Sequence, residues 1–180
     1  MKQFFFIFTL ILLSIPYAYS DFQIWNADSV NIRFSNRTVF EISSEFRYRQ
    51  TATKLYYKHY QGRLTFIRSP NFLITPGYRQ LYLRQVNHWI KEYHPMLDLT
   101  LQVQGQNSWA ISNRSRIVYR IFEKRPGLWR FRNRLEVICP IQLTEYGIKP
   151  YFADEFFLDE NHGINQNRLA FGLKIPYHER

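Results

Sequence analysis

The sequence predicts an all-β protein, an antiparallel up-and-down β-barrel of about eight to ten strands with a polar interior and an apolar exterior. Segments in which polar and apolar residues alternate recur along the chain, and short turn-rich breaks separate them. Helical periodicity is weak throughout. After the N-terminal segment, no stretch is long and apolar enough for a transmembrane helix, so insertion into a membrane would require β-strands.

The first 20 residues have the order of a secretory signal peptide. Lys2 precedes an apolar run over residues 4–15, and Pro16, Ala18 and Ser20 follow it, which predicts cleavage before Asp21. A membrane anchor is the alternative, but the run has about a dozen residues, whereas a bilayer-spanning helix needs roughly 20. Residues 1–20 are therefore expected to be removed on export, and residues 21–180 are expected to form a single β-barrel domain.

Nine alternating segments are predicted to be strands. They cover residues 22–32, 38–49, 54–67, 71–85, 92–104, 108–123, 128–139, 147–158 and 164–176. The breaks between them are short, so neighbours in sequence are expected to be neighbours in the sheet. Because closed bacterial barrels normally have an even number of strands, a count of nine indicates a missed strand or an incomplete last one.

The two faces differ most clearly in the predicted strand 92–104. Its apolar residues alternate with its more polar ones: Pro95, Leu97, Leu99, Leu101 and Val103 against His94, Met96, Asp98, Thr100, Gln102 and Gln104. The strands 38–49 and 128–139 are interpreted in the same way, each with one wholly apolar face. Alternation alone also fits a soluble periplasmic barrel or sandwich that binds an apolar ligand. Strand lengths and the aromatic residues near strand ends favour a membrane barrel.

The polar faces are expected to form a charge network inside the barrel. An unpaired charge shielded from water is costly, so the guanidinium groups need carboxylates, ideally in bidentate pairs. The predicted network consists of Glu41, Glu45, Asp98, Arg114, Arg116, Arg120, Arg130, Arg132, Arg134, Glu136, Glu155 and Arg168. Structural filling of the lumen is the favoured interpretation, and a pathway for an anion or another solute is the alternative.

A hairpin register is also predicted for the strands 108–123 and 128–139. A turn about residues 124–126 places Arg114 opposite Glu136, Arg116 opposite Arg134, and Arg120 opposite Arg130. Contacts between like charges are unfavourable across two strands. Glu155 of the next strand is therefore expected to reach Arg134.

Charge and cysteine content narrow the class of protein. The formal net charge of +10 suggests anionic partners, and export favours lipid headgroups over nucleic acid. Cys139 is the only cysteine, so neither an intrachain disulfide nor a cysteine-type metal site is expected. His94 and Asp98 share a face but lie about 13 Å apart along a strand, too far for a direct hydrogen bond. No enzymatic activity, cofactor or metal is expected, and an outer-membrane lipid-modifying enzyme is the least favoured alternative.

Several motifs carry a resemblance to a known family. Asn-Arg pairs recur in Ser112-Asn113-Arg114, Arg132-Asn133-Arg134 and Gln166-Asn167-Arg168, alongside residues 21–25, 76–79, 94–98, 119–122, 128–135, 150–155 and 165–169. Together they resemble the bacterial family called domain of unknown function 2490. The resemblance implies an exported outer-membrane β-barrel of about ten strands with no established activity or catalytic residues. The expected partners are outer-membrane lipids and the outer-membrane assembly machinery, and the expected role is structural, or the binding or passage of a small solute.

Overall fold

A computed structural model describes residues 23–49, 53–86, 88–105, 109–145 and 147–174. Within these residues nine strands form one sheet. They are β1 (Ile24–Ser35), β2 (Thr38–Arg49), β3 (Lys54–Ser69), β4 (Phe72–Gln85), β5 (His88–Gln104), β6 (Ala110–Phe122), β7 (Leu128–Ile138), β8 (Lys149–Asp159) and β9 (Gly163–Lys174). The predicted signal peptide at residues 1–20 lies outside the described residues, as do residues 175 and 176 of the last predicted strand.

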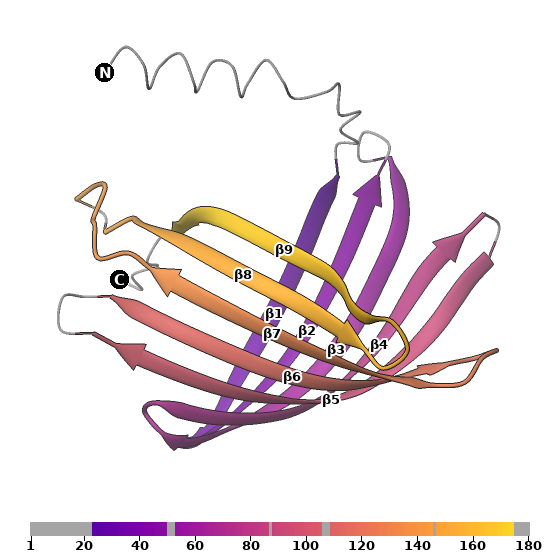
Figure 1. The fold of residues 1–180 in the computed structure, drawn as a ribbon, viewed down its shortest axis with the longest axis horizontal. Coiled ribbons are helices and arrows are strands. Elements are labelled where there is room, and N and C mark those ends of the chain that lie inside the picture. Colours follow the sequence, from indigo (N-terminus) through magenta and orange to yellow (C-terminus); the bar gives the residue numbers. More distant parts are fainter. Residues whose placement is uncertain (1–22, 50–52, 87, 106–108, 146, 175–180) are drawn as a thin grey trace, which may run out of the picture.

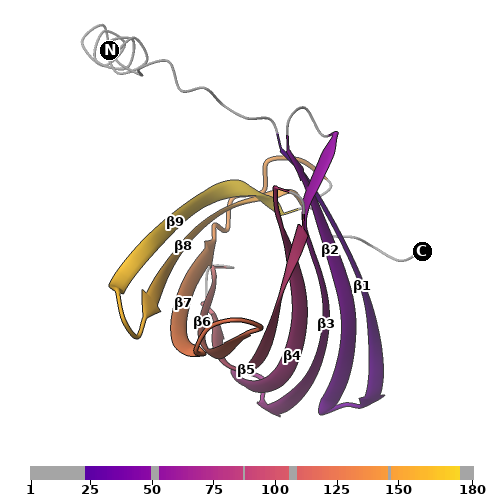
Figure 2. The same cartoon turned by 90° about the vertical axis from the view of Figure 1, so that its right-hand side faces the viewer.

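The strands follow one another in sequence order, and each pairs antiparallel with the next. The sheet curls into a half-barrel (Figure 1). Figure 2 shows β5 and β6 at the base of the curl, with β1 and β2 on one side and β8 and β9 on the other. The all-β, up-and-down prediction is therefore confirmed. The largest difference in strand bounds is at β5, which begins at His88 and not at residue 92.

On one face the sheet buries polar and charged side chains together with apolar ones. In β5, where side chains alternate between faces, Glu92, His94 and Asp98 are buried, whereas Leu97 and Leu99 are each 40% exposed. This pattern is the reverse of a soluble sheet, in which the apolar face is covered. We call the side of the sheet that carries Asp98 the concave face, and the side that carries Leu97 the convex face.

The two outer strands lack a neighbour on one side. Every residue of β1 is exposed, and β9 is exposed except at Ala170 and Gly172, which are half-buried. In the described part of the chain β1 bonds only to β2 and β9 only to β8. Each of these strands therefore presents a free row of backbone N–H and C=O groups.

The predicted register of the β6–β7 hairpin is wrong by two residues. Arg114 lies opposite Arg134, Arg116 opposite Arg132, and Arg120 opposite Leu128, while Glu136 lies opposite Ser112. The centre of the hairpin lies at Lys124, one residue before the predicted centre at Arg125, and Arg120 and Leu128 form its last pair. A shift of two residues keeps every side chain on its predicted face but changes its cross-strand partner.

The prediction of a wholly apolar face is also wrong at two positions. Ser44 and Asn133 alternate with residues of the concave face, so both lie on the convex face. Asn133 is bonded there: its Nδ2 lies 3.0 Å from Asn113 Oδ1 and 3.0 Å from Ser115 Oγ, and Asn113 Nδ2 donates back to Asn133 Oδ1 at 3.1 Å. These amides satisfy one another, which lowers the cost of carrying them on an apolar surface.

Candidate functional site

The most buried charged pair joins β5 to β6. Arg116 Nε and Nη2 donate to Asp98 Oδ1 and Oδ2, both at 2.6 Å, and the two side chains are only 3% and 2% exposed. Asp98 and Arg116 face each other directly in the strand register. The bidentate geometry uses both carboxylate oxygens, which compensates each charge where water is excluded.

Arg63 approaches the same carboxylate from β3. Its Nη1 lies 3.8 Å from Asp98 Oδ2, and its Nη2 lies 2.5 Å from Glu41 Oε2. Gly77 on β4 makes room for the arm of Arg63, because a Cβ there would lie 2.9 Å from Arg63 Cγ and 3.1 Å from the Gly62 carbonyl oxygen. Because Gly77 has no side chain, Arg63 has the space to lie between Glu41 and Asp98.

One oxygen of Glu155 serves two arginines. Glu155 Oε1 accepts from Arg132 Nη2 at 2.8 Å and from Arg114 Nη2 at 3.1 Å. The carboxylate therefore reaches between guanidinium groups, as predicted for this residue, but it bonds Arg132 and Arg114 and not Arg134. The Nε atoms of Arg114 and Arg132 are buried and have no hydrogen-bond partner among the described residues.

The remaining predicted residues pair nearer the ends of their strands. Arg134 donates to Glu136 at 3.0 Å, and Lys174 bonds the other oxygen of Glu136 at 2.6 Å. Arg47 pairs with Glu45. At the opposite end of the sheet, Arg130 forms a bidentate pair with Asp159, with its Nη2 at 2.6 Å from Asp159 Oδ2.

Glu92 contacts both an arginine and a histidine. It accepts from Arg120 Nη2 at 2.8 Å and lies 2.9 Å from His94 Nε2. His94 therefore contacts Glu92 on its own strand and not Asp98, in agreement with the separation expected along a strand. The described residues contain no group of three His, Cys, Asp or Glu side chains placed to hold a metal ion.

These side chains surround a cavity of about 570 Å³ on the concave face. Nine arginines line it: Arg47, Arg63, Arg79, Arg114, Arg116, Arg120, Arg130, Arg132 and Arg168. Glu45, Glu92 and Asp28 are the lining carboxylates, and Glu41, Asp98, Glu155 and Asp159 bond the arginines from the wall. Guanidinium groups thus outnumber carboxylates, so the net formal charge of the cavity lining is positive.

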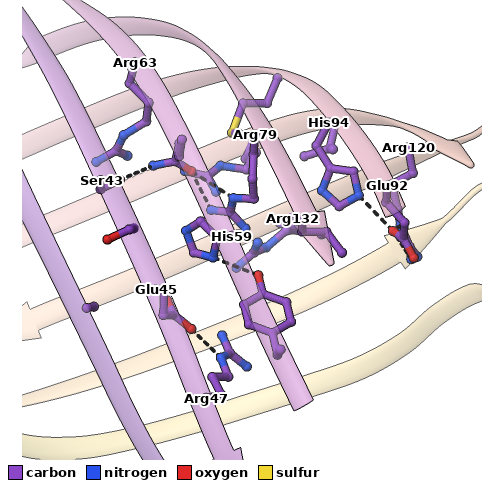
Figure 3. Close-up of a pocket in the computed structure, with 18 of the residues that line it drawn as sticks. Ser43, Glu45, Arg47, His59, Arg63, Arg79, Glu92, His94, Arg120 and Arg132 are labelled. Atoms are coloured by element: carbon purple, nitrogen blue, oxygen red, sulfur yellow. Dashed lines mark hydrogen bonds and ion pairs between the residues drawn. The ribbon is translucent and has the colours of Figure 1, made fainter. Parts of the chain in front are cut away.

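Arg79 and Arg168 account for this excess. Among the described residues, Arg79 donates side-chain hydrogen bonds only to Gln61, through Nε at 3.0 Å and Nη2 at 2.6 Å, and Arg168 donates only to Gln166, at 3.3 Å. Neither has a carboxylate within 4.0 Å among the described residues. Figure 3 shows Arg79, His59 and Arg132 converging from three different strands.

The whole described sheet falls within one family. The model of the family described as Protein of unknown function (DUF2490) matches residues 22–180. The chain belongs to this family. No curated protein sequence and no solved structure matches the chain. None of the described residues forms a helix of the length and apolar character that crossing a membrane requires.

In this member of the DUF2490 family, sequence reasoning missed several residues of the cavity: Tyr57, His59, Gln61, Arg63, Arg79, Glu92, His94 and Asp159 line it or bond its arginines. Glu92 and His94 could have been found, since both share a face with Asp98 by simple alternation. Arg63 and Arg79 carry no such signal, because their strands mix polar and apolar residues on both faces.

Proposed function

We propose that the chain is an outer-membrane β-barrel protein, exported through the signal peptide at residues 1–20, whose arginine-lined cavity holds a small solute. One observation carries the proposal: the sheet buries an ion pair such as Asp98–Arg116 while Leu99 and Leu101 on the next positions are 40% and 56% exposed. In water this arrangement loses hydrophobic burial and desolvates charges at the same time. In a bilayer the exposed leucines meet lipid, and only the polar face needs internal partners.

The extent of the convex apolar surface supports a membrane. It includes Val30 on β1, Leu97 and Leu99 on β5, Ile117 on β6, and Phe171 on β9, each 40% exposed or more. Large contiguous apolar patches are rare on soluble monomers, and they mark protein or membrane contacts.

Basic and aromatic side chains gather near one rim of the convex face. Lys58 lies 5.0 Å from the ring centroid of Tyr82 and 5.1 Å from that of Trp89, and Arg84 lies 5.7 Å from the Trp89 ring. Trp and Tyr favour the membrane interface, and cations there attract anionic headgroups. This rim supports outer-membrane lipids as partners.

Cell fractionation tests the location. We expect the full-length chain, expressed in a Gram-negative host, to remain with the outer-membrane fraction after a wash with high salt and alkaline carbonate, because its contact with lipid is apolar. Mass spectrometry of the mature protein should find Asp21 at its N-terminus. Release by the wash would support the runner-up instead, a soluble periplasmic barrel or sandwich that binds an apolar ligand.

The proposal requires that the free edges of β1 and β9 be sealed in lipid, since unpaired backbone groups in hydrocarbon cost several kcal/mol each. Eight successive antiparallel pairings make β1 and β9 run in the same direction. A direct seam between them is therefore parallel. We propose this seam as the closure of the barrel.

Disulfide trapping tests the seam. In a Cys139→Ser background, Ser29→Cys on β1 is combined in turn with Gln166→Cys and Ala170→Cys on β9, all on the concave face. A disulfide requires Cα atoms within about 7 Å of each other. If β1 and β9 form a seam, one of the two combinations should meet this requirement and form an intrachain disulfide in membranes. Ser29→Cys with Thr100→Cys, on the distant strand β5, is the control that should stay reduced. Disulfide-linked dimers in place of intrachain bonds would contradict direct closure.

A further inference from the structure

Neighbouring carboxylates balance only part of the positive charge of three arginines in the cavity. We call these three residues, Arg79, Arg132 and Arg168, the arginine cluster. Arg79 and Arg168 have glutamine partners in place of carboxylates. Arg132 shares a single oxygen of Glu155 with Arg114, and its buried Nε has no partner among the described residues. A guanidinium group presents five N–H donors, so each member keeps donors free for a further acceptor.

Two members of the cluster, Arg132 and Arg168, contact the same aromatic ring. The guanidinium carbons of Arg132 and Arg168 each lie 4.6 Å from the ring centroid of Phe157, a side chain from β8 that is 2% exposed. Stacking on a buried ring fixes the plane of a guanidinium group without using its hydrogen-bond donors. The N–H donors of Arg132 and Arg168 lie in the planes of their guanidinium groups, so stacking on the ring leaves these donors available for hydrogen bonds.

Arg79 reaches the same space from β4, beside a second polar pair. The Tyr57 hydroxyl lies 2.9 Å from His59 Nδ1, and both side chains are buried among the residues that line the cavity. Figure 3 shows His59 between Arg79 and Arg132. Arg79, His59 and Arg132 thus bring donors from β4, β3 and β7 to one part of the cavity, which Arg168 of β9 also lines. Glu45 lines the cavity as well, but it bonds Arg47.

We infer that the arginine cluster binds a small soluble oxyanion, one that carries a phosphate or carboxylate group. Such a group accepts several charge-assisted hydrogen bonds at once and neutralises the excess positive charge. The cavity of about 570 Å³ is within the size range of small-molecule sites. This inference rests on the solute-holding part of the proposed function and names the class of solute, but it does not depend on the membrane location.

Titration with inorganic phosphate tests the inference. The full chain is purified in an uncharged maltoside detergent and titrated by calorimetry, with sodium chloride of equal ionic strength as the blank. Phosphate should bind, and Arg79→Gln and Arg168→Gln should each weaken binding by at least about tenfold, which corresponds to one charge-assisted hydrogen bond. Arg37→Gln, in the exposed turn before β2, removes the same charge outside the cavity and should bind phosphate like the unmodified chain.

Thermal unfolding supplies a readout of opposite sign, so a folding defect cannot imitate the result. Without phosphate, Arg79→Gln should unfold at the same or a higher temperature than the unmodified chain, because it removes a cation that has no carboxylate partner. At one phosphate concentration, the unmodified chain and Arg37→Gln should gain more stability than Arg79→Gln and Arg168→Gln.

Three results would overturn the inference. Equal phosphate affinity in Arg79→Gln and Arg168→Gln would exclude the cluster, and equal loss in Arg37→Gln would indicate diffuse attraction only. Binding of dihexanoyl phosphatidic acid without binding of inorganic phosphate would identify a lipid headgroup in place of a soluble anion. Phosphate binding by a protein that the carbonate wash releases would retain the inference and reject the membrane location.

Discussion

Arg116→Met is expected to destabilise the protein by about 3–5 kcal/mol, because it leaves the Asp98 carboxylate buried without its bidentate partner. Asp98 is 2% exposed, and its other cationic neighbour, Arg63, is 3.8 Å away and already bonded to Glu41. The free energy of unfolding would be measured by urea titration of the protein folded into lipid vesicles. The double variant Asp98→Leu/Arg116→Met should recover much of the loss, since it removes both charges.

Arg134→Met is the matched control. The Arg134 side chain is 30% exposed, and Glu136 keeps Lys174 as a partner after the substitution. A partly exposed pair with a remaining cation should lose no more than about 1 kcal/mol. Equal losses at Arg116 and Arg134 would show that water reaches both pairs equally, which contradicts the burial of the β5–β6 pair.

The strands could be predicted from sequence because their signal is local. In β5 the alternation of Asp98, Thr100 and Gln102 with Leu97, Leu99 and Leu101 is enough to place each side chain on one of two faces. No knowledge of the neighbouring strands is needed for this step. The placement of Asp98 and Arg116 on the same face was predictable for this reason.

The identity of each ion pair was less predictable, because it depends on register. Moving the β6–β7 pairing by two residues leaves Arg114 on the concave face but replaces Glu136 by Arg134 across the strand pair. The register depends on how the chain turns between Phe122 and Leu128, where Gly127 packs against Tyr119: a Cβ on Gly127 would lie 2.5 Å from the Tyr119 hydroxyl oxygen. Contacts of this kind are absent from a pattern of polar and apolar residues.

The uncompensated arginines were predicted only in part. Arg168 and Arg132 lie in strands with visible alternation. The β8–β9 register places Glu155 opposite Arg168, but Glu155 bonds Arg132 and Arg114, and alternation alone does not indicate this choice of partner. Arg79 lies in a strand whose concave residues include Leu81 and Leu83 and whose convex residues include Gln80, so alternation does not mark it as a cavity residue. Charge excess in the cavity is a property of the assembled sheet.

Leu99→Arg is expected to impair insertion by roughly 2–4 kcal/mol, the cost of an arginine on the lipid face of a barrel near the bilayer midplane. Leu99 is 40% exposed on the convex face, and its cross-strand neighbours are Ile74 and Ser115. Neither neighbour offers a carboxylate, so the new guanidinium group would meet lipid without a partner. Folding into vesicles, followed by urea titration, measures the loss.

Two further substitutions in β5 separate the effect of face from that of depth. Thr100→Arg places the same side chain on the concave face, beside Leu73 and Arg114, where the polar cavity can solvate it, so its cost should be smaller. Val103→Arg stays on the convex face but lies next to the last residue of β5, where the lipid-facing cost of arginine falls to about 0–1 kcal/mol. The order Leu99, then Thr100 and Val103, is specific to a membrane-spanning strand. In a soluble sheet whose convex face meets water, Leu99→Arg would be about as mild as Val103→Arg and milder than Thr100→Arg, and that result would reject a lipid-facing convex surface.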